Sequence, residues 1–191
     1  NLQELVCNNN NLTELNCSNM ARLRDVVCFA NQLKKIDLSN CYSLTSLDCS
    51  VNPTLETLQL SPSIQTLDVS QCALKEIPGL NQLYRLKSLN CGDNELTELD
   101  LSSAYGLEVL SCPKNQIKDL SAVAQLYALT SLNVSGNPIT ALTVPNAYNI
   151  YFIKIDGTAL DACALNALYR SLRERREDDQ QNDFGGCMLF N

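Results

Sequence analysis

One short pattern recurs along the whole chain and constrains its fold more than any other feature. The pattern is LxxLxCxxN, with other aliphatic residues at some leucine and cysteine positions, and each copy begins 20 to 22 residues after the previous one. The copies start at Leu2, Leu23, Leu44, Ile64, Leu86, Leu107, Leu129 and Ile150. A fixed period of this length is typical of a solenoid, in which each repeat stacks on its neighbours to bury a shared core.

The alternation within each copy predicts a short β-strand with one inward face. Stacking the copies pairs these strands in parallel and gives every inward residue a neighbour above and below. A second, weaker copy lies between successive first copies and predicts a second strand in the turn. These weaker copies start at Leu12, Leu33, Leu55, Leu96 and Ile139.

An asparagine ends most of the first copies, at a predicted tight bend. Its amide can satisfy backbone groups that a bent, buried chain leaves unpaired. The asparagines are Asn10, Asn31, Asn52, Asn94, Asn115 and Asn137. Cys72 and Thr158 take this position in the other two copies, where we expect a different hydrogen-bonding pattern.

The pattern resembles the leucine-rich repeats, and in particular the nested 21-residue type of bacterial surface and secreted proteins. Residues 74–96 and 117–139 are similar to the 22-residue repeats of internalins, in which a helical turn replaces the second strand. The resemblance covers residues 2–160. It implies an α/β repeat fold, a right-handed leucine-rich-repeat β-solenoid of about eight turns with a parallel sheet.

The C-terminal segment changes period. Leu165, Leu168 and Leu172 recur at helical spacing after Asp161, a suitable N-cap residue. An acidic run and then "GGCMLFN" predict a loop and a final strand. The arrangement is similar to the helix-plus-strand cap that closes solenoids of this family. We therefore divide the chain into a solenoid, residues 1–160, and a C-terminal cap, residues 161–191.

Ten cysteines raise the question of a chemical role. Six of them (Cys7, Cys17, Cys28, Cys49, Cys91 and Cys112) occupy positions where other copies carry Val, Ile or Leu, so the position favours a small buried hydrophobe. No CxxC pair with zinc-site spacing occurs. Cys163 and Cys187 both lie in the predicted cap, where a disulfide is possible in an oxidising compartment.

Composition excludes several functions. The net charge of −7 disfavours nucleic acid as a partner, and no apolar run reaches the length of a membrane-spanning helix. The chain contains no histidine, which removes histidine-based catalysis and Cys/His zinc sites. We expect no enzyme activity, no cofactor and no metal. The chain opens at Asn1 within a repeat, so we expect a segment upstream that has been removed.

Outward positions of the predicted strands are the candidates for function. We predict a partner-binding strip there, with apolar residues at both ends of a small, polar middle. Its residues are Val27, Phe29, Asp48, Asp68, Asn90, Tyr151, Phe152 and Lys154. The same residues also fit a plain surface that tolerates aromatics, or one that a neighbouring domain covers. The outward carboxylates at Asp48, Asp68 and Asp100 are interpreted as solvated, since no calcium-loop pattern surrounds them.

Five tyrosines share one position, two residues before the first leucine of a copy. They are Tyr42, Tyr84, Tyr105, Tyr127 and Tyr148, and we call this set the tyrosine edge. Consecutive turns place such rings about 5 Å apart, which permits offset stacking. The edge is either a packing spine of the solenoid or a surface that stacks on a glycan or a peptide.

The sequence therefore predicts a monomeric, non-catalytic module that binds a protein partner. Two alternatives stay open: a spacer that presents another domain, and a glycan-binding module along the tyrosine edge. The resemblance implies an extracellular, cell-surface or periplasmic location.

Overall fold

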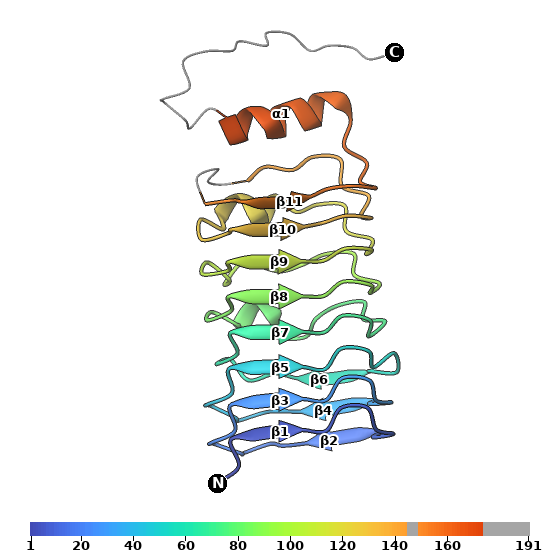
Figure 1. Ribbon diagram of the computed structural model, residues 1–191, viewed down its shortest axis with the longest axis vertical. Coiled ribbons are helices and arrows are strands. Elements are labelled where there is room, and N and C mark those ends of the chain that lie inside the picture. The colour runs from blue at the N-terminus through green and yellow to red at the C-terminus, as the bar shows by residue number, and fades with distance from the viewer. Residues whose placement is uncertain (145–148, 174–191) are drawn as a thin grey trace.

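The computed structural model describes residues 1–144 and 149–173, which form a stack of turns with eight parallel strands along one face (Figure 1). We call this face the front sheet. Its strands are β1 (Glu4–Val6), β3 (Asp25–Val27), β5 (Ser46–Asp48), β7 (Thr66–Asp68), β8 (Ser88–Asn90), β9 (Val109–Ser111), β10 (Ser131–Asn133) and β11 (Phe152–Lys154). The predicted parallel solenoid is confirmed. Because a turn runs from one strand to the next, eight strands enclose about seven turns.

Strand pairing in the front sheet keeps the repeats in frame. The middle residue of each strand faces the core and pairs with its equivalents in the neighbouring strands. This inward column is Leu5, Val26, Leu47, Leu67, Leu89, Leu110, Leu132 and Ile153. Six of the eight are at most 1 % exposed, whereas Leu5 and Ile153 in the two outermost strands are only partly buried.

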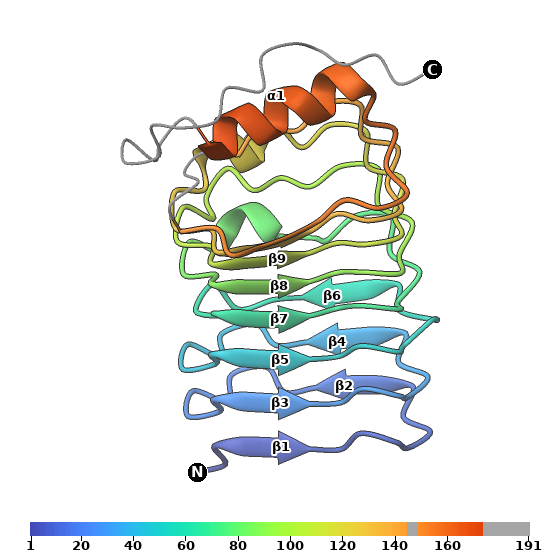
Figure 2. The same ribbon diagram turned by 45° about the horizontal axis from the view of Figure 1, so that its top comes forward.

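The opposite side of the stack differs between its two halves. The first three turns carry a second parallel sheet of three strands, β2 (Glu14–Asn16), β4 (Lys35–Asp37) and β6 (Thr57–Gln59). Farther along, two 3₁₀ turns replace strands, η1 (Leu80–Gln82) and η2 (Ser121–Gln125), as the internalin-like spacing predicts. Figure 2 shows β2, β4 and β6 behind the front sheet.

Two predicted back strands are wrong. The copies that start at Leu96 and Ile139 form no strand, although Leu99 and Leu142 face the core as expected. The stretch from Leu96 lies between η1 and η2 in the order of turns, so it has no extended neighbour on either side. A parallel ladder needs such a neighbour, and the alternating pattern alone does not supply one.

The predicted asparagine bends form a ladder that joins successive turns. Each buried asparagine donates from Nδ2 to a carbonyl of its own turn and to one of the preceding turn, and its Oδ1 accepts an N–H of the preceding turn. For Asn52 these partners are the carbonyls of Cys49 (2.9 Å) and Cys28 (3.2 Å) and the amide of Leu33 (3.0 Å). Asn31, Asn94, Asn115 and Asn137 repeat the arrangement.

The two substituted positions confirm the expected change in hydrogen bonding. The Cys72 thiol donates to the Cys49 carbonyl of the preceding turn at 3.3 Å, and the hydroxyl of Thr158 donates to the Ile155 carbonyl of its own turn at 2.8 Å. A thiol is a weak partner compared with an amide. In the first turn the side chain of Asn10 bonds only within its own turn, to the carbonyls of Cys7 and Asn8.

Every first copy also contains one residue with positive φ, seven positions after its first leucine. Gly136 and Gly157 suit this left-handed conformation, but Val51 adopts it with φ of 55°. The remaining members are Asn9, Ala30, Gln71, Asp93 and Lys114. A β-branched residue is unfavourable here, so the repeat geometry imposes local strain at Val51.

The helix α1 (Ala162–Arg173) lies across the C-terminal end of the stack (Figures 1 and 2). Asp161 caps it as predicted, since its Oδ1 accepts the amide of Ala164 at 2.7 Å. Leu168 is 1 % exposed, and Leu165 and Leu172 are half-buried. The helix therefore covers apolar surface at this end. The predicted cap loop and final strand lie outside the described residues.

Candidate binding surfaces

The register of the front sheet gathers most of the predicted binding strip on one face. The third residue of each strand points outward, and these residues form a row: Val6, Val27, Asp48, Asp68, Asn90, Ser111, Asn133 and Lys154. Five of the eight predicted strip residues belong to this row. Phe29 follows two residues after β3, while Tyr151 and Phe152 lie at the start of β11.

The acidic and amide side chains in the middle of the strip are engaged in local hydrogen bonds. Oδ1 of Asp68 accepts from the hydroxyl (2.6 Å) and the amide (2.9 Å) of Ser70, and Oδ2 accepts from Nδ2 of Asn90 at 2.8 Å. Asp48 and Ser50 repeat the first arrangement. Asp48 and Asp68, interpreted from the sequence as solvated, are instead half-buried and close the turn that follows each strand.

The apolar side chains of the strip differ in exposure. Tyr151 and Phe152 are 79 % and 44 % exposed at the C-terminal end. Val27 and Phe29, predicted to be exposed, are half-buried. Val27 pairs between Val6 and Asp48, so its neighbours shield it. Val6, which the sequence analysis did not single out, is the exposed apolar residue at this end, with 58 % exposure.

Four members of the tyrosine edge lie in the described residues, and all are largely exposed. Tyr42, Tyr84, Tyr105 and Tyr127 are between 59 % and 69 % exposed. The guanidinium of Arg85 lies 5.8 Å from the centre of the Tyr84 ring, within cation–π range, and the Tyr42 hydroxyl donates to Oδ1 of Asn40 at 2.8 Å. Tyr148 lies outside the described residues, and the stacking of these rings stays a prediction.

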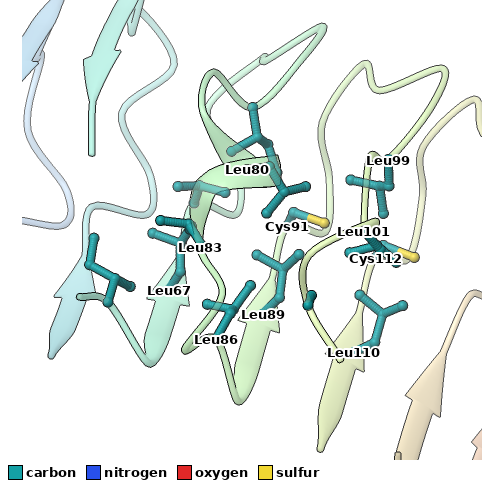
Figure 3. Packing of buried hydrophobic residues seen from close by; sticks show 14 of the residues in the cluster. Leu67, Leu80, Leu83, Leu86, Leu89, Cys91, Leu99, Leu101, Leu110 and Cys112 are labelled. Carbon is teal, nitrogen blue, oxygen red and sulfur yellow. The ribbon is translucent and has the colours of Figure 1, made fainter. Parts of the chain in front are cut away.

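The cysteines line the inside of the stack. Of the six at repeat positions, five are buried and Cys7, in the first turn, is half-buried. Figure 3 shows Cys91 and Cys112 among core leucines such as Leu89 and Leu110. The prediction of buried core thiols is therefore confirmed for these five.

The environment of these thiols disfavours the reactive thiolate. Burial raises the pKa of Cys72 to about 11, and burial followed by the proximity of Cys41 raises the pKa of Cys17 to about 11. The hydrogen bond with Cys112 and then burial raise the pKa of Cys91. A thiol that stays protonated is a poor nucleophile and a poor metal ligand. The predicted Cys163–Cys187 disulfide involves a residue outside the described part of the chain and stays a prediction.

Two other kinds of site are absent from residues 1–144 and 149–173. No group of three or more Cys, Asp or Glu side chains in these ranges is arranged to hold a metal ion, and no helix there is both long and apolar enough to cross a bilayer. A hollow of about 350 Å³ lies between successive bends. Its lining residues are Val51, Pro53, Gln71, Ala73, Asp93, Asn94 and Glu95.

Comparison with known proteins agrees with this architecture. Residues 62–103 and 106–146 match a family model described as leucine-rich repeats, two copies. No curated protein matches the chain. Among solved structures, internalin C2 from Listeria monocytogenes superposes with a TM-score of 0.73 at 26 % identity, over 86 % of this chain and 76 % of that one.

Two further structures show a similar stack. The functional domain of InlJ from Listeria monocytogenes, which includes a cysteine ladder, has a TM-score of 0.61 at 27 % identity over 82 % of this chain. YopM from Yersinia enterocolitica has a TM-score of 0.61 at 21 % identity over 82 % of this chain, a similarity of fold alone. This chain spans 39 % of the solved InlJ chain and 38 % of the YopM chain.

Proposed function

From the premise that the chain is a leucine-rich-repeat protein of the bacterial, internalin-like type, we propose that it is a non-catalytic module that binds a protein partner through its front sheet. The observation that carries this proposal is the pair of exposed aromatic side chains at the start of β11: Tyr151, directly before the strand, and Phe152, its first residue. Exposed aromatics beside a flat polar surface are typical anchors of protein interfaces. Lys154 lies two residues farther on, in the outward row of the same face.

The rigidity of the front sheet supports this role. Each strand is hydrogen-bonded to both neighbours, except at the two ends, and the Asp–Ser pairs fix the bends that follow β5 and β7. A surface that is already ordered loses little conformational entropy on binding, so more of the contact energy appears as affinity. The front sheet therefore presents side chains at fixed intervals of about 4.8 Å.

A non-catalytic role also agrees with the chemistry of the chain. There is no histidine in the sequence, and burial raises the pKa of thiols such as Cys17 and Cys72 to about 11. A general base with a pKa near neutrality, the usual requirement for hydrolysis, is therefore hard to assign. We place the protein outside the cell or in the cell envelope, by analogy with the internalins that it resembles.

The test is selection of binders followed by substitution of the proposed anchors. The folded protein is panned against displayed ectodomains and peptides, and each selected binder is titrated by calorimetry. We expect Tyr151→Ser and Phe152→Ser to weaken at least one protein binder by about tenfold or more, as loss of an interface anchor does. Tyr169→Ser, which removes a tyrosine that is 52 % exposed on α1, is the matched control.

Two results would contradict the proposal. Binders that are indifferent to Tyr151, Phe152 and Phe29 alike would leave the front sheet without a role and favour the spacer alternative. Turnover of any substrate by the purified protein would overturn the non-catalytic assignment.

A further inference from the structure

The edge where the chain enters the front sheet carries a second continuous row of side chains. Backbone hydrogen bonds join equivalent residues from turn to turn, for example from Thr45 to Arg24 and from Lys87 to Gln65, each at 2.8 Å. We call this line the entry row. Its members are Gln3, Arg24, Thr45, Gln65, Lys87, Glu108, Thr130 and Tyr151. The row borders the tyrosine edge on the side where the arrows begin in Figure 1.

The charge of this edge is opposite to that of the whole chain. The entry row contributes Arg24 and Lys87, and the residues directly after Ala21 and Tyr84 contribute Arg22 and Arg85. Glu108 is the carboxylate of the entry row, and it pairs with Lys87 at 3.1 Å. These four cations and one carboxylate give a local charge of +3, in a chain whose net charge is −7. All five side chains belong to exposed residues.

The cations are largely available to a ligand. Within the described residues, Arg22, Arg24 and Arg85 take part in none of the ion pairs. Arg22 donates to Oδ1 of Asn1 at 3.1 Å, a neutral acceptor, and Arg85 faces the Tyr84 ring. Arginine and tyrosine side by side, exposed and without an ionic partner, match the composition of interface hot spots.

We propose that this edge binds an extended, acidic segment of a protein partner. The inference rests on the proposed function and adds the chemistry of the segment and a surface of charged and tyrosine side chains that adjoins the front-sheet anchors at Tyr151. From the turn of Arg24 to the turn of Tyr127 there are five sheet spacings, roughly 24 Å, a length that an extended segment of about seven residues covers. Carboxylates of the segment pair with Arg22, Arg24, Arg85 and Lys87, while its backbone and aliphatic groups pack on the tyrosine rings.

The experiment uses defined probes. A fluorescein-labelled peptide of about twelve alternating Glu and Thr residues, longer than the edge, is titrated by anisotropy, beside the same peptide with Gln for every Glu. We expect the acidic peptide to bind at least about tenfold more tightly than the Gln peptide, with the difference shrinking as salt is added. The variant Arg24→Ala/Arg85→Ala/Lys87→Ala is expected to lose this preference, and Tyr105→Ala/Tyr127→Ala to weaken binding severalfold.

Matched variants separate this surface from general electrostatics. Lys34→Ala/Lys35→Ala/Lys118→Ala removes three exposed cations from the other side of the stack, and Tyr169→Ala removes a tyrosine of α1; both are expected to leave the affinity unchanged. The proposal would be overturned if the protein bound the Gln peptide as tightly as the acidic peptide. It would also be overturned if the Lys34/Lys35/Lys118 variant lost as much affinity for the acidic peptide as the Arg24/Arg85/Lys87 variant. Binding of a sulfated oligosaccharide without binding of the acidic peptide would overturn it too, and would favour a glycan ligand.

The outcome is distinguishable from that of the proposed function. If the selected protein binders depend on Tyr151 and Phe152 but ignore the arginine variant, and the acidic peptide does not bind, the edge has no role and the front-sheet function stands. If the acidic peptide binds through the edge while no protein binder depends on the front sheet, the edge has the binding role and the front-sheet proposal fails.

Discussion

The first three turns and the turns after residue 62 build the same front sheet on two different backs. In the first part, β2, β4 and β6 form a second sheet, whereas the later part has 3₁₀ turns and irregular chain. The family model matches only the later part, at residues 62–103 and 106–146. The front strands nevertheless pair in one register throughout. The front face is therefore set by the inward leucines and the asparagine ladder, and the back is free to vary.

The largest expected effect tests whether the asparagine ladder contributes equally to the stability of the first three turns and of the later turns. Asn52→Ala leaves the buried amide of Leu33 and the carbonyls of Cys28 and Cys49 without this partner, and Asn115→Ala does the same in the later part. Since each unpaired buried group costs about 1–3 kcal/mol, we expect both changes to lower the free energy of unfolding by about 3 kcal/mol or more. Urea unfolding followed by circular dichroism measures it.

The control for the ladder prediction is Asn10→Ala in the first turn. Asn10 is exposed and bonds only within its own turn, so its loss should cost less than about 0.5 kcal/mol. A large difference between Asn52→Ala and Asn115→Ala would show that the two parts depend on the ladder unequally.

The next largest effect compares the cost of a proline in the back sheet with its cost in the irregular back of the later part. The amide of Thr57 in β6 donates to the carbonyl of Lys34, so Thr57→Pro removes a bond of the back sheet and should cost about 3 kcal/mol. Glu98 occupies the equivalent position in the later part. Within the described residues its amide donates no hydrogen bond, and we expect Glu98→Pro to cost about 1 kcal/mol or less. Equal costs, measured by thermal unfolding, would mean that the irregular back is ordered as tightly as the sheet.

A smaller effect of opposite sign is expected at the left-handed position. Val51→Gly relieves the strain of a β-branched residue at φ of 55° and should raise the free energy of unfolding by about 1 kcal/mol. The reciprocal change, Gly136→Val in the later part, should lower it by at least as much, because Gly136 has φ of 68° and a Cβ there would meet Lys114 at 3.4 Å. Stabilisation by Gly136→Val would contradict the assigned geometry.

The smallest effect concerns two equivalent aspartates on the back. Hydrogen bonds from Ser39 lower the pKa of Asp37, and hydrogen bonds from Ser102 lower the pKa of Asp100. A lowered pKa in the folded state adds stability above the unfolded pKa of about 3.9, and this stability is lost as pH falls through the folded value. Each of the two changes, Asp37→Asn and Asp100→Asn, should make the loss of stability below about pH 4 slightly smaller, and by a similar amount. Acid titrations followed by circular dichroism detect it.

Much of the fold was predictable because the repeat is local and periodic. The spacing of Leu5, Val26 and Leu47 sets the strands and their register, and the asparagine positions set the ladder. The failed back strands at Leu96 and Ile139 show the limit, since pairing depends on what the adjacent turns do. The N-cap at Asp161 followed from side-chain chemistry alone.

The candidate surfaces were less predictable. Frame position assigned Phe29 to the outside and left Tyr105 either in a packing spine or on a binding surface, but Phe29 is half-buried and Tyr105 is 69 % exposed. Exposure depends on the size of the neighbouring side chains in adjacent turns, which a single copy of the pattern does not contain. The positive charge that Arg22 and Arg85 form with the entry row likewise emerges only when turns far apart in the sequence are placed side by side.

The thiol at position 72 has a consequence for the mechanics of the stack. Cys72 reaches the preceding turn with one weak donor, where Asn52 and Asn94 make a donor contact and also accept an amide. Pulled from its two ends, a solenoid extends turn by turn, each turn releasing about 21 residues or on the order of 70 Å of chain. The turn of Thr158, which also lacks this link, is the last one under α1, so among the inner turns from β3 to β10 we expect the first rupture at the turn of Cys72, close to where the back sheet ends.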